Sequence, residues 1–313
     1  MHHPVLSSLL PVVLLIAIGF VAARAGWIRA EASKDLSNLV FMVLTPALLF
    51  RTMSSVHVEQ LNFQPIAVYF VAVLLLFGAT MAWQGFSQRA AVLALAVTFS
   101  NTVMIGIPLI GLAYGQAGLV TLFTLISVHS LVLLTLATVI LELVSARDER
   151  RKGQGSQRPM AYTVLEAVKN GVIHPVPLPI IVGLVFAQTG LVLPEVMDRP
   201  LQLLGNAFGP MALVLVGVTL TQVQVGPHLR GALGITFVKN LCLAALMAAL
   251  GWAWGMTGLP YAVMVVTASL PMGANVFLFS QRYEVAQDLV TAGMAVSTVL
   301  ALVTTSIVML MLQ

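Results

Sequence analysis

Charged residues are scarce in this chain, and their scarcity decides which class of protein it is. Of its 313 residues, only 8% are Asp, Glu, Lys or Arg, whereas 59% are hydrophobic. No soluble domain could cover that much apolar surface, so the composition predicts an all-α polytopic membrane protein. The few basic residues lie in short loops between apolar runs. They indicate membrane topology rather than a patch for nucleic acid, and no nucleic-acid partner is expected.

Cysteine and enzyme motifs are also nearly absent. Cys242 is the single cysteine, which excludes an intramolecular disulfide and a thiolate metal cluster. The sequence has no HExxH, no P-loop, no GxSxG with a plausible partner and no intramembrane carboxylate pair of the protease kind. We therefore expect no enzyme activity, no metal site and no cofactor. Because the chain has no nucleotide site, coupling to a proton or sodium gradient would have to supply any energy that its activity requires.

Long apolar runs are what the chain does have. Ten of them fill most of its length, at about 5–23, 36–54, 64–84, 90–114, 118–145, 173–189, 201–221, 231–254, 259–281 and 288–312. A bilayer core accepts about 20 apolar residues in a helix, so each run predicts a transmembrane helix.

A single long hydrophilic interruption divides the ten runs into five and five. It is Ser145–Met160, SARDERRKGQGSQRPM, which predicts an exposed linker. We therefore divide the chain into a first five-helix repeat at 1–146, a cytoplasmic linker at 147–172 and a second repeat at 173–313. Within the linker, Tyr162–Val172 is either a short interfacial helix or a simple loop.

The two halves resemble each other at a nearly constant offset. Glycines or prolines recur 164 residues apart at three places and 163 apart at a fourth: Gly19 and Gly183, Gly26 and Gly190, Pro46 and Pro210, and Pro108 and Pro271. Four such matches favour a duplication. Because each half has an odd number of spans, the second half must be inverted, which gives an inverted 5+5 repeat.

The basic residues also predict the orientation in the membrane. If residues 145–160 are cytoplasmic, twelve Lys and Arg residues lie in inner loops, and only Arg51 and Arg199 lie in outer loops. This strong bias places both termini outside. We expect an integral protein of a bacterial inner membrane, with periplasmic termini and a cytoplasmic loop at 145–160.

Two of the apolar runs are interrupted near their middle. The fourth contains Phe99–Leu109, FSNTVMIGIPL, and the ninth contains Leu270–Phe279, LPMGANVFLF. Proline breaks or kinks a helix, and freed backbone groups in a membrane must be satisfied by protein or by a water-filled cavity. Two interrupted segments in corresponding halves indicate the binding site of a secondary transporter. The alternative is a pair of proline-kinked helices with a structural role.

The residues at these interruptions suit an anionic ligand. Half-helices starting at Pro108 and Pro271 would direct their positive N-terminal ends at a carboxylate. Asparagine amides add donors and acceptors, and glycine lets the backbone approach a ligand closely. The predicted substrate-binding residues are Asn101, Thr102, Gly106, Pro108, Pro271, Gly273 and Asn275.

Four further polar residues are candidates for a coupling or site-lining role. Lys239, beside Asn240, lies inside the eighth run, where a charge is expensive and functional by default. It either has a site-lining or conformational coupling role, or extends to the cytoplasmic interface. His129, inside the fifth run, is either a proton relay or a hydrogen-bonded packing residue. Ser100 is a weaker candidate beside the first interruption.

These segments resemble the auxin efflux carrier family. The matching stretches are VFMVLTPALLF at 40–50, SNTVMIGIPLIGLAYG at 100–115, Lys239 with Asn240, and LPMGANVFLFSQRY at 270–283. The resemblance implies a fold like that of the bile acid/sodium symporters. In that fold the fourth and ninth spans cross at their prolines, here Pro108 and Pro271, with substrate bound beside the crossover. The short central loop is similar to that of bacterial members, and the malonate-carrier type implies small mono- or dicarboxylates.

We predict a secondary active transporter of small organic anions that works by alternating access. The alternative is an anion channel or a ligand-sensing membrane protein on the same fold. The expected partners are a small organic anion and the lipid bilayer, with a homodimer as a further option.

Overall fold

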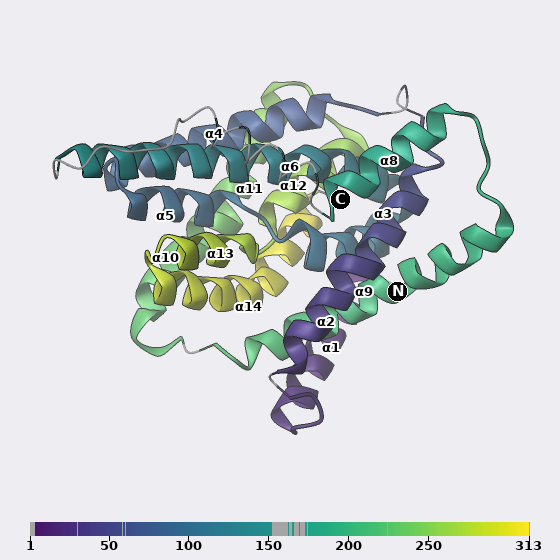
Figure 1. Ribbon diagram of the computed structural model, residues 1–313, viewed down its shortest axis with the longest axis horizontal. Coiled ribbons are helices and arrows are strands. Elements are labelled where there is room, and N and C mark those ends of the chain that lie inside the picture. The colour runs from purple at the N-terminus through teal and green to yellow at the C-terminus, as the bar shows by residue number, and fades with distance from the viewer. Residues whose placement is uncertain are drawn as a thin grey trace.

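The computed structural model describes residues 4–29, 31–57, 59, 61–151, 162, 165, 169, 173, 175–223 and 225–312. These residues form helices and no strands (Figure 1). The helical elements are α1 (Pro4–Arg24), α2 (Ala32–Leu39), η1 (Val40–Leu44), α3 (Thr45–Met53), α4 (Gln64–Gln84), α5 (Gln88–Thr98), η3 (Thr102–Gly106), α6 (Ile107–Arg151), α8 (Pro177–Gln188), α9 (Glu195–Leu220), η4 (Gly226–His228), α10 (Leu229–Phe237), η5 (Val238–Cys242), α11 (Leu243–Ala253), α12 (Gly258–Ser269), α13 (Asn275–Arg282) and α14 (Gln287–Met311).

Six helical stretches of the described chain are long and apolar enough to cross a membrane. They are Ala32–Met53, Gln64–Gln84, Thr102–Arg147, Glu195–Leu220, Gly226–Ala253 and Gln287–Met311. Four shorter apolar helices accompany them, at Leu9–Arg24, Gln88–Thr98, Pro177–Gln188 and Gly258–Ser269. Each of the ten predicted runs overlaps one of these stretches. The polytopic membrane class is therefore supported, whereas the number of ten spans stays a prediction.

Helix α6 extends beyond the fifth apolar run at its C-terminal end. It continues to Arg151, so residues 147–151 at the start of the predicted linker are helical. The segment Ala146–Arg151 consists of good helix formers and one aspartate, which explains why the helix outlasts the apolar run. The proposed interfacial helix at Tyr162–Val172 lies largely outside the described residues.

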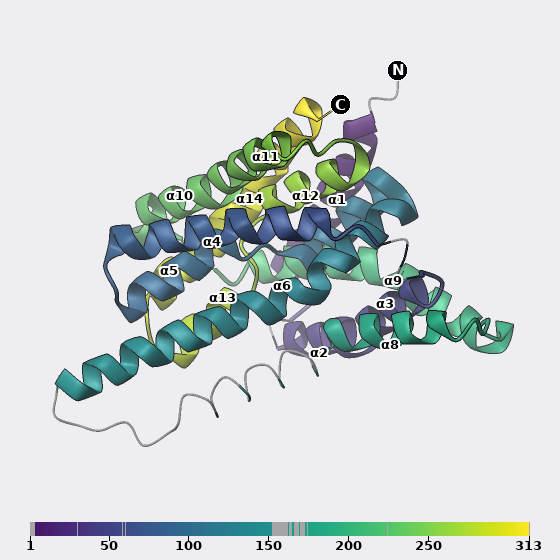
Figure 2. The ribbon, with the colours of Figure 1, turned by 90° about the horizontal axis from the view of Figure 1, so that it is seen from above.

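The helices pack into two bundles that each draw on both halves of the sequence. The α9 bundle contains α1, α2, η1, α3, α8 and α9, whereas the α14 bundle contains α4, α5, η3, α6, η5 and α10–α14. Figure 2 shows α2, α3, α8 and α9 together on one side of the molecule and α4, α5, α10 and α11 on the other. The bundles meet where α6 packs against α1, α8 and α9. A boundary between bundles therefore lies near the middle of the molecule.

Inside the α9 bundle, two close helix contacts are related by the predicted offset. A methyl group added at Gly19 of α1 would lie 1.9 Å from the carbonyl oxygen of Val214 in α9. One added at Gly183 of α8 would lie 2.8 Å from the carbonyl oxygen of Phe50 in α3. Gly19 and Gly183 are 164 residues apart, and so are Phe50 and Val214. The first half therefore contacts the second in the same way as the second contacts the first.

Left-handed backbone turns recur in a similar pattern. Residues with positive φ are found 164, 170 and 171 residues apart in three pairs: Gly26 and Gly190, Gly85 and Gly255, and Gly115 and Ala286. At Gly115 the chain adopts φ 59° and ψ −153° and interrupts α6 between the fourth and fifth predicted runs. These pairs support the predicted duplication. Inversion of the repeat across a membrane stays a prediction.

Candidate functional site

The two interrupted segments contact each other through their main chains. The amide nitrogen of Asn101 donates to the carbonyl oxygen of Pro271 at 2.8 Å, and that of Gly273 donates to the carbonyl of Phe99 at 2.9 Å. Ser100 and Met272 thus form one antiparallel bridge. We call this contact, formed by Phe99–Asn101 and Leu270–Gly273, the crossing. Helices α5 and α12 end at it, and η3 and α13 begin beside it.

At the first interruption, Asn101 starts the new helix. Its side-chain oxygen accepts a hydrogen bond from the Met104 amide at 3.2 Å, which is the geometry of an N-cap. The half-helix therefore begins at Thr102, and the prediction that it begins at Pro108 is wrong. Pro108 lies inside α6, where it follows the wide turn of η3. A wide turn moves the preceding carbonyls away from the proline ring and lets the helix continue.

Pro108 faces the other bundle rather than the crossing. It is buried, and its Cβ would lie 3.7 Å from a methyl group at Gly209 of α9. Pro271 lies within the second interruption, four residues before α13 begins at Asn275, so it does not begin a half-helix either. The Pro108–Pro271 recurrence therefore does not relate equivalent positions of the two halves.

At the second interruption, three side chains satisfy the freed backbone groups. The Lys239 ammonium donates to the carbonyl oxygens of Ala268 at 2.9 Å and Leu270 at 2.7 Å. The Ser297 hydroxyl accepts from the Met272 amide at 3.2 Å. On the same helix as Ser297, Thr305 donates to the carbonyl oxygen of Ser269 at 3.1 Å.

Lys239 is buried completely, with 0% of its surface exposed. It does not extend to the interface, which was one of the two alternatives. Its positive charge lies at the carbonyl end of α12, where a cation stabilises the helix dipole. Asn240 has a different role, since its amide donates to the Ser297 carbonyl at 3.0 Å and so holds η5 against α14.

Two of the predicted glycines lie where the two segments approach each other closely. A methyl group at Gly273 would lie 2.7 Å from the Phe99 ring and 3.0 Å from the Ser100 carbonyl oxygen. One at Gly106 would lie 2.9 Å from a methyl carbon of Leu270. A side chain at Gly273 would displace the other segment, whereas one at Gly106 would require a shift of the Leu270 side chain.

A cavity of about 310 Å³ opens directly beside the crossing. Ser100, Asn101, Thr102, Gly273 and Asn275 line it from the α14 bundle. We call it the crossing cavity. The other predicted residues do not line it: Pro108 faces α9, whereas Gly106, His129, Lys239, Asn240 and Pro271 support or adjoin the crossing. The predicted set therefore divides into residues at the cavity and residues behind it.

The opposite wall of the crossing cavity comes from the α9 bundle, which the sequence prediction missed. Ser37 and Asn38 of α2 line it, together with Phe41 and Met42 of η1. The polar pair Ser37–Asn38 inside the second apolar run was the signal that could have identified this wall. Ser130 of α6 also lines the cavity and was missed.

The histidine behind the crossing is not hydrogen-bonded, contrary to one of the alternatives above. His129 is completely buried, and neither ring nitrogen has a hydrogen-bond partner among the described residues. Its ring instead packs 4.6 Å from that of Phe99 and 5.5 Å from that of Tyr69, measured between centroids.

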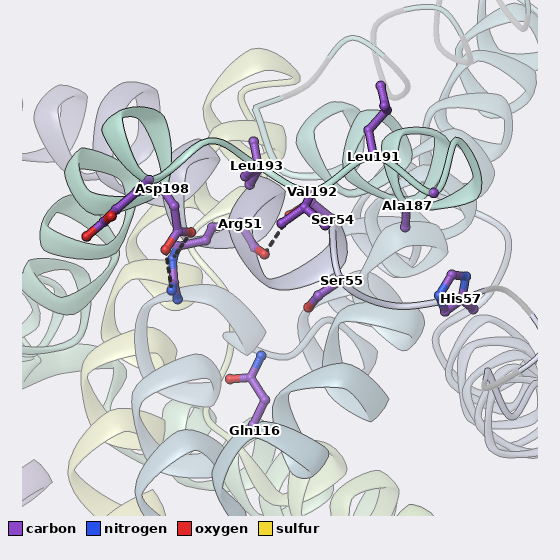
Figure 3. A pocket seen from close by; sticks show the side chains of 12 residues that line it. Arg51, Ser54, Ser55, His57, Gln116, Ala187, Leu191, Val192, Leu193 and Asp198 are labelled. Atoms are coloured by element: carbon purple, nitrogen blue, oxygen red, sulfur yellow. Dashed lines mark hydrogen bonds and ion pairs between the residues drawn. The ribbon is translucent and has the colours of Figure 1, made fainter.

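A second cavity, of about 530 Å³, lies at the other end of α8 (Figure 3). Val176, just before α8, lines the crossing cavity, whereas Ala187 and the residues after the helix line this far cavity. Arg51 forms a two-pronged ion pair there with Asp198, at 2.7 and 3.0 Å. Figure 3 shows that Gln116 of α6 reaches toward this cavity from a different helix than Arg51 and Asp198. The crossing cavity therefore lies between the two bundles, and the far cavity lies at the α9 bundle with Gln116 of the α14 bundle at its wall.

Comparison with known proteins places the chain in a family. A family model described as a membrane transport protein matches residues 4–309. The chain belongs to the auxin efflux carrier family. It is an integral membrane protein of a transporter family, and several of its relatives are named as carriers or transporters.

Individual relatives align with nearly the whole chain at low identity. "Auxin efflux carrier component 8" of Arabidopsis thaliana is 20% identical over 97% of this chain and 96% of its own length. "Putative malonate transporter" of Rhizobium meliloti (strain 1021) is 25% identical over 94% and 92%. "Lysosomal cholesterol signaling protein" of Mus musculus is 21% identical over 91% of this chain but 35% of its own length.

Proposed function

We propose that this family member is a secondary active transporter of small organic anions, mono- or dicarboxylates such as malonate. The observation that carries the proposal is the crossing cavity, which collects the polar residues of both interruptions into one space. Its volume of about 310 Å³ lies at the lower end of the range for ligand pockets, which suits a small substrate.

The groups around the crossing cavity favour a negatively charged ligand. The N-terminal ends of η3 and α13 lie at its wall, with Asn101 and Asn275 as the first polar side chains. Helix N-termini present free amide groups and a partial positive charge. Neither Lys nor Arg is among the described residues that line the cavity. The anion would then be recognised by the helix dipoles of η3 and α13 and by the amides of Asn101 and Asn275. The positive charge of Lys239 would lie behind these groups.

The two cavities support alternating access. They lie at opposite ends of α8 and are both bounded by the two bundles. Movement of one bundle relative to the other would open one cavity as it closes the other. We place the crossing cavity on the cytoplasmic side, because it borders Pro175 and Val176 after the basic linker. The far cavity would then face the periplasm of a bacterial inner membrane, on the same side as both termini.

Counterflow in proteoliposomes tests the proposal. Vesicles preloaded with unlabelled malonate should accumulate labelled malonate above the level of unloaded vesicles, since only a carrier exchanges substrate across the membrane. Asn101→Ala and Asn275→Ala should each reduce this uptake at least tenfold, while the proteins remain folded in detergent. Asn62→Ala, which removes an exposed amide in the α3–α4 loop, is the matched control and should transport normally. Normal uptake by both cavity variants would place the site elsewhere.

Ligand sensing without transport is the second candidate, because one relative is named as a signaling protein. In that case carboxylates would raise the melting temperature of the purified protein but give no counterflow. An anion channel would instead give uptake that is not stimulated by internal malonate.

A further inference from the structure

Behind the crossing lies a group of buried polar side chains that lack partners. We call Tyr69 of α4, Ser100 of the crossing and His129 of α6 the polar cluster. All three are 0% exposed. The Tyr69 hydroxyl faces the Ser100 hydroxyl without a well-aligned hydrogen bond, and four polar atoms of the cluster have no partner among the described residues. Buried polar atoms are normally paired, so several unpaired atoms in one place indicate a missing ligand.

The polar cluster adjoins the crossing cavity. Ser100 belongs to both, because it lines the cavity and faces Tyr69. Ser130, the residue after His129, lines the cavity as well. The Phe99 ring stands between the cavity and the His129 imidazole, with its centroid 4.6 Å from the imidazole. Phe99 and Ser100 therefore connect the crossing cavity to the polar cluster, Phe99 through its ring contact with His129 and Ser100 through Tyr69.

Among the described residues, Lys239 is the source of charge that acts on His129. Lys239 lies on η5, and Tyr69 is the titratable group in ring contact with His129. No described Asp or Glu acts on it. Protonation of His129 would place a charge in a completely buried site, and it would also create a second buried cation near Lys239. Both effects disfavour protonation unless an anion is present.

We propose that His129 is a proton-binding site that is filled when a dicarboxylate occupies the crossing cavity. This inference rests on the proposed function and names its coupling ion. A proton from cavity water binds to a free ring nitrogen of His129, which becomes an imidazolium. The two negative charges of the substrate then balance Lys239 and His129. Proton and dianion each increase the affinity for the other, as linkage requires.

Calorimetry on the purified full-length protein tests this without any variant. Malonate is titrated in two buffers that differ in their enthalpy of ionisation, at the same pH. Coupled protonation makes the apparent enthalpies differ by an amount that corresponds to uptake of about one proton per malonate bound. The dissociation constant should rise with pH, by up to about tenfold per pH unit.

Two matched variants assign the proton to its site. His129→Gln keeps hydrogen-bonding atoms but carries no proton, so it should bind malonate more weakly, with no proton uptake and no dependence on pH. His228→Gln makes the same chemical change at a partly exposed histidine of η4 that lines neither cavity, and it should behave like the wild type.

Three outcomes would overturn the proposal. Malonate binding without proton uptake in the wild type overturns it alone and leaves the proposed function standing. Unchanged proton uptake in His129→Gln shows that the proton resides elsewhere, for instance on malonate itself. Failure of both malonate and succinate to bind overturns this inference together with the carboxylate function.

Discussion

At the scale of single residues, the crossing depends most directly on Gly273. Its amide bonds the Phe99 carbonyl, and the Phe99 ring occupies the space that a side chain at 273 would need. Gly273→Ala should therefore force the two segments apart and lower the free energy of unfolding by about 1–3 kcal/mol. Malonate binding should fall with it, because the cavity wall moves.

The matched control for this prediction is Gly78→Ala. Gly78 lies inside α4, and a methyl group there would meet no atom within 4 Å. Alanine favours a helix interior by about 0.5–1 kcal/mol over glycine, so this variant should melt at the same or a higher temperature. Melting curves in detergent compare the two. Equal behaviour would mean that the crossing tolerates a side chain.

At the residue scale, the sequence predicted which kinds of side chain occur at the interruptions better than it predicted where each half-helix begins. Asn101, Thr102, Gly273 and Asn275 line the cavity, as their polarity and small size suggested. The prolines were misplaced because their effect on a helix was judged for regular α-helical turns. The wide turn before Pro108 depends on bonds five residues apart, which no local pattern reveals.

At the scale of elements, one hydrogen bond joins α6 to the turn between α13 and α14. The Tyr283 hydroxyl donates to the Glu142 carboxylate at 3.0 Å. Burial first, and then this bond and the Glu142 charge, raise the pKa of Tyr283 from 10.0 to about 12. The phenol is thus a donor throughout the neutral range.

Tyr283→Phe should destabilise the protein by roughly 1–2 kcal/mol, because it leaves the partly buried Glu142 without this donor. The folded-state pKa of Tyr283 is raised, so its contribution is present below about pH 10 and is lost as the pH rises toward about 12. Melting temperatures of both proteins at pH 7 and pH 11 measure this. A difference that is as large at high pH as at neutral pH would contradict the assignment.

The length of the apolar runs identified the helices, whereas the helices that pack against one another could not be predicted. All ten runs contain helix, because a run of about 20 apolar residues in a membrane has few other conformations. The pairing of α1 with α9 and of α3 with α8 follows from contacts between residues far apart in the sequence. Glycine recurrence at 19 and 183 indicated this symmetry without showing which helices meet.

At the scale of the whole molecule, the cavities at opposite ends of α8 predict opposite changes in access. In a Cys242→Ser background, Asn38→Cys reports on the crossing cavity and Gln116→Cys on the far cavity. Malonate should change the rate of labelling by a water-soluble maleimide in opposite directions at the two positions. Asn62→Cys in the exposed α3–α4 loop is the control, and its labelling rate should not respond to malonate. Parallel changes at 38 and 116 would contradict alternating access.

The crossing consists of main-chain atoms, and this has an evolutionary consequence. Its two hydrogen bonds involve the amide groups of Asn101 and Gly273 and the carbonyl groups of Pro271 and Phe99. Side-chain substitutions leave such bonds intact unless they add bulk at Gly273 or remove an amide hydrogen. The side chains around the crossing are therefore free to diverge and to adapt to new substrates, while the main-chain contact that positions them is retained. A main-chain contact of this kind can persist during evolution while the residues that determine substrate selectivity change.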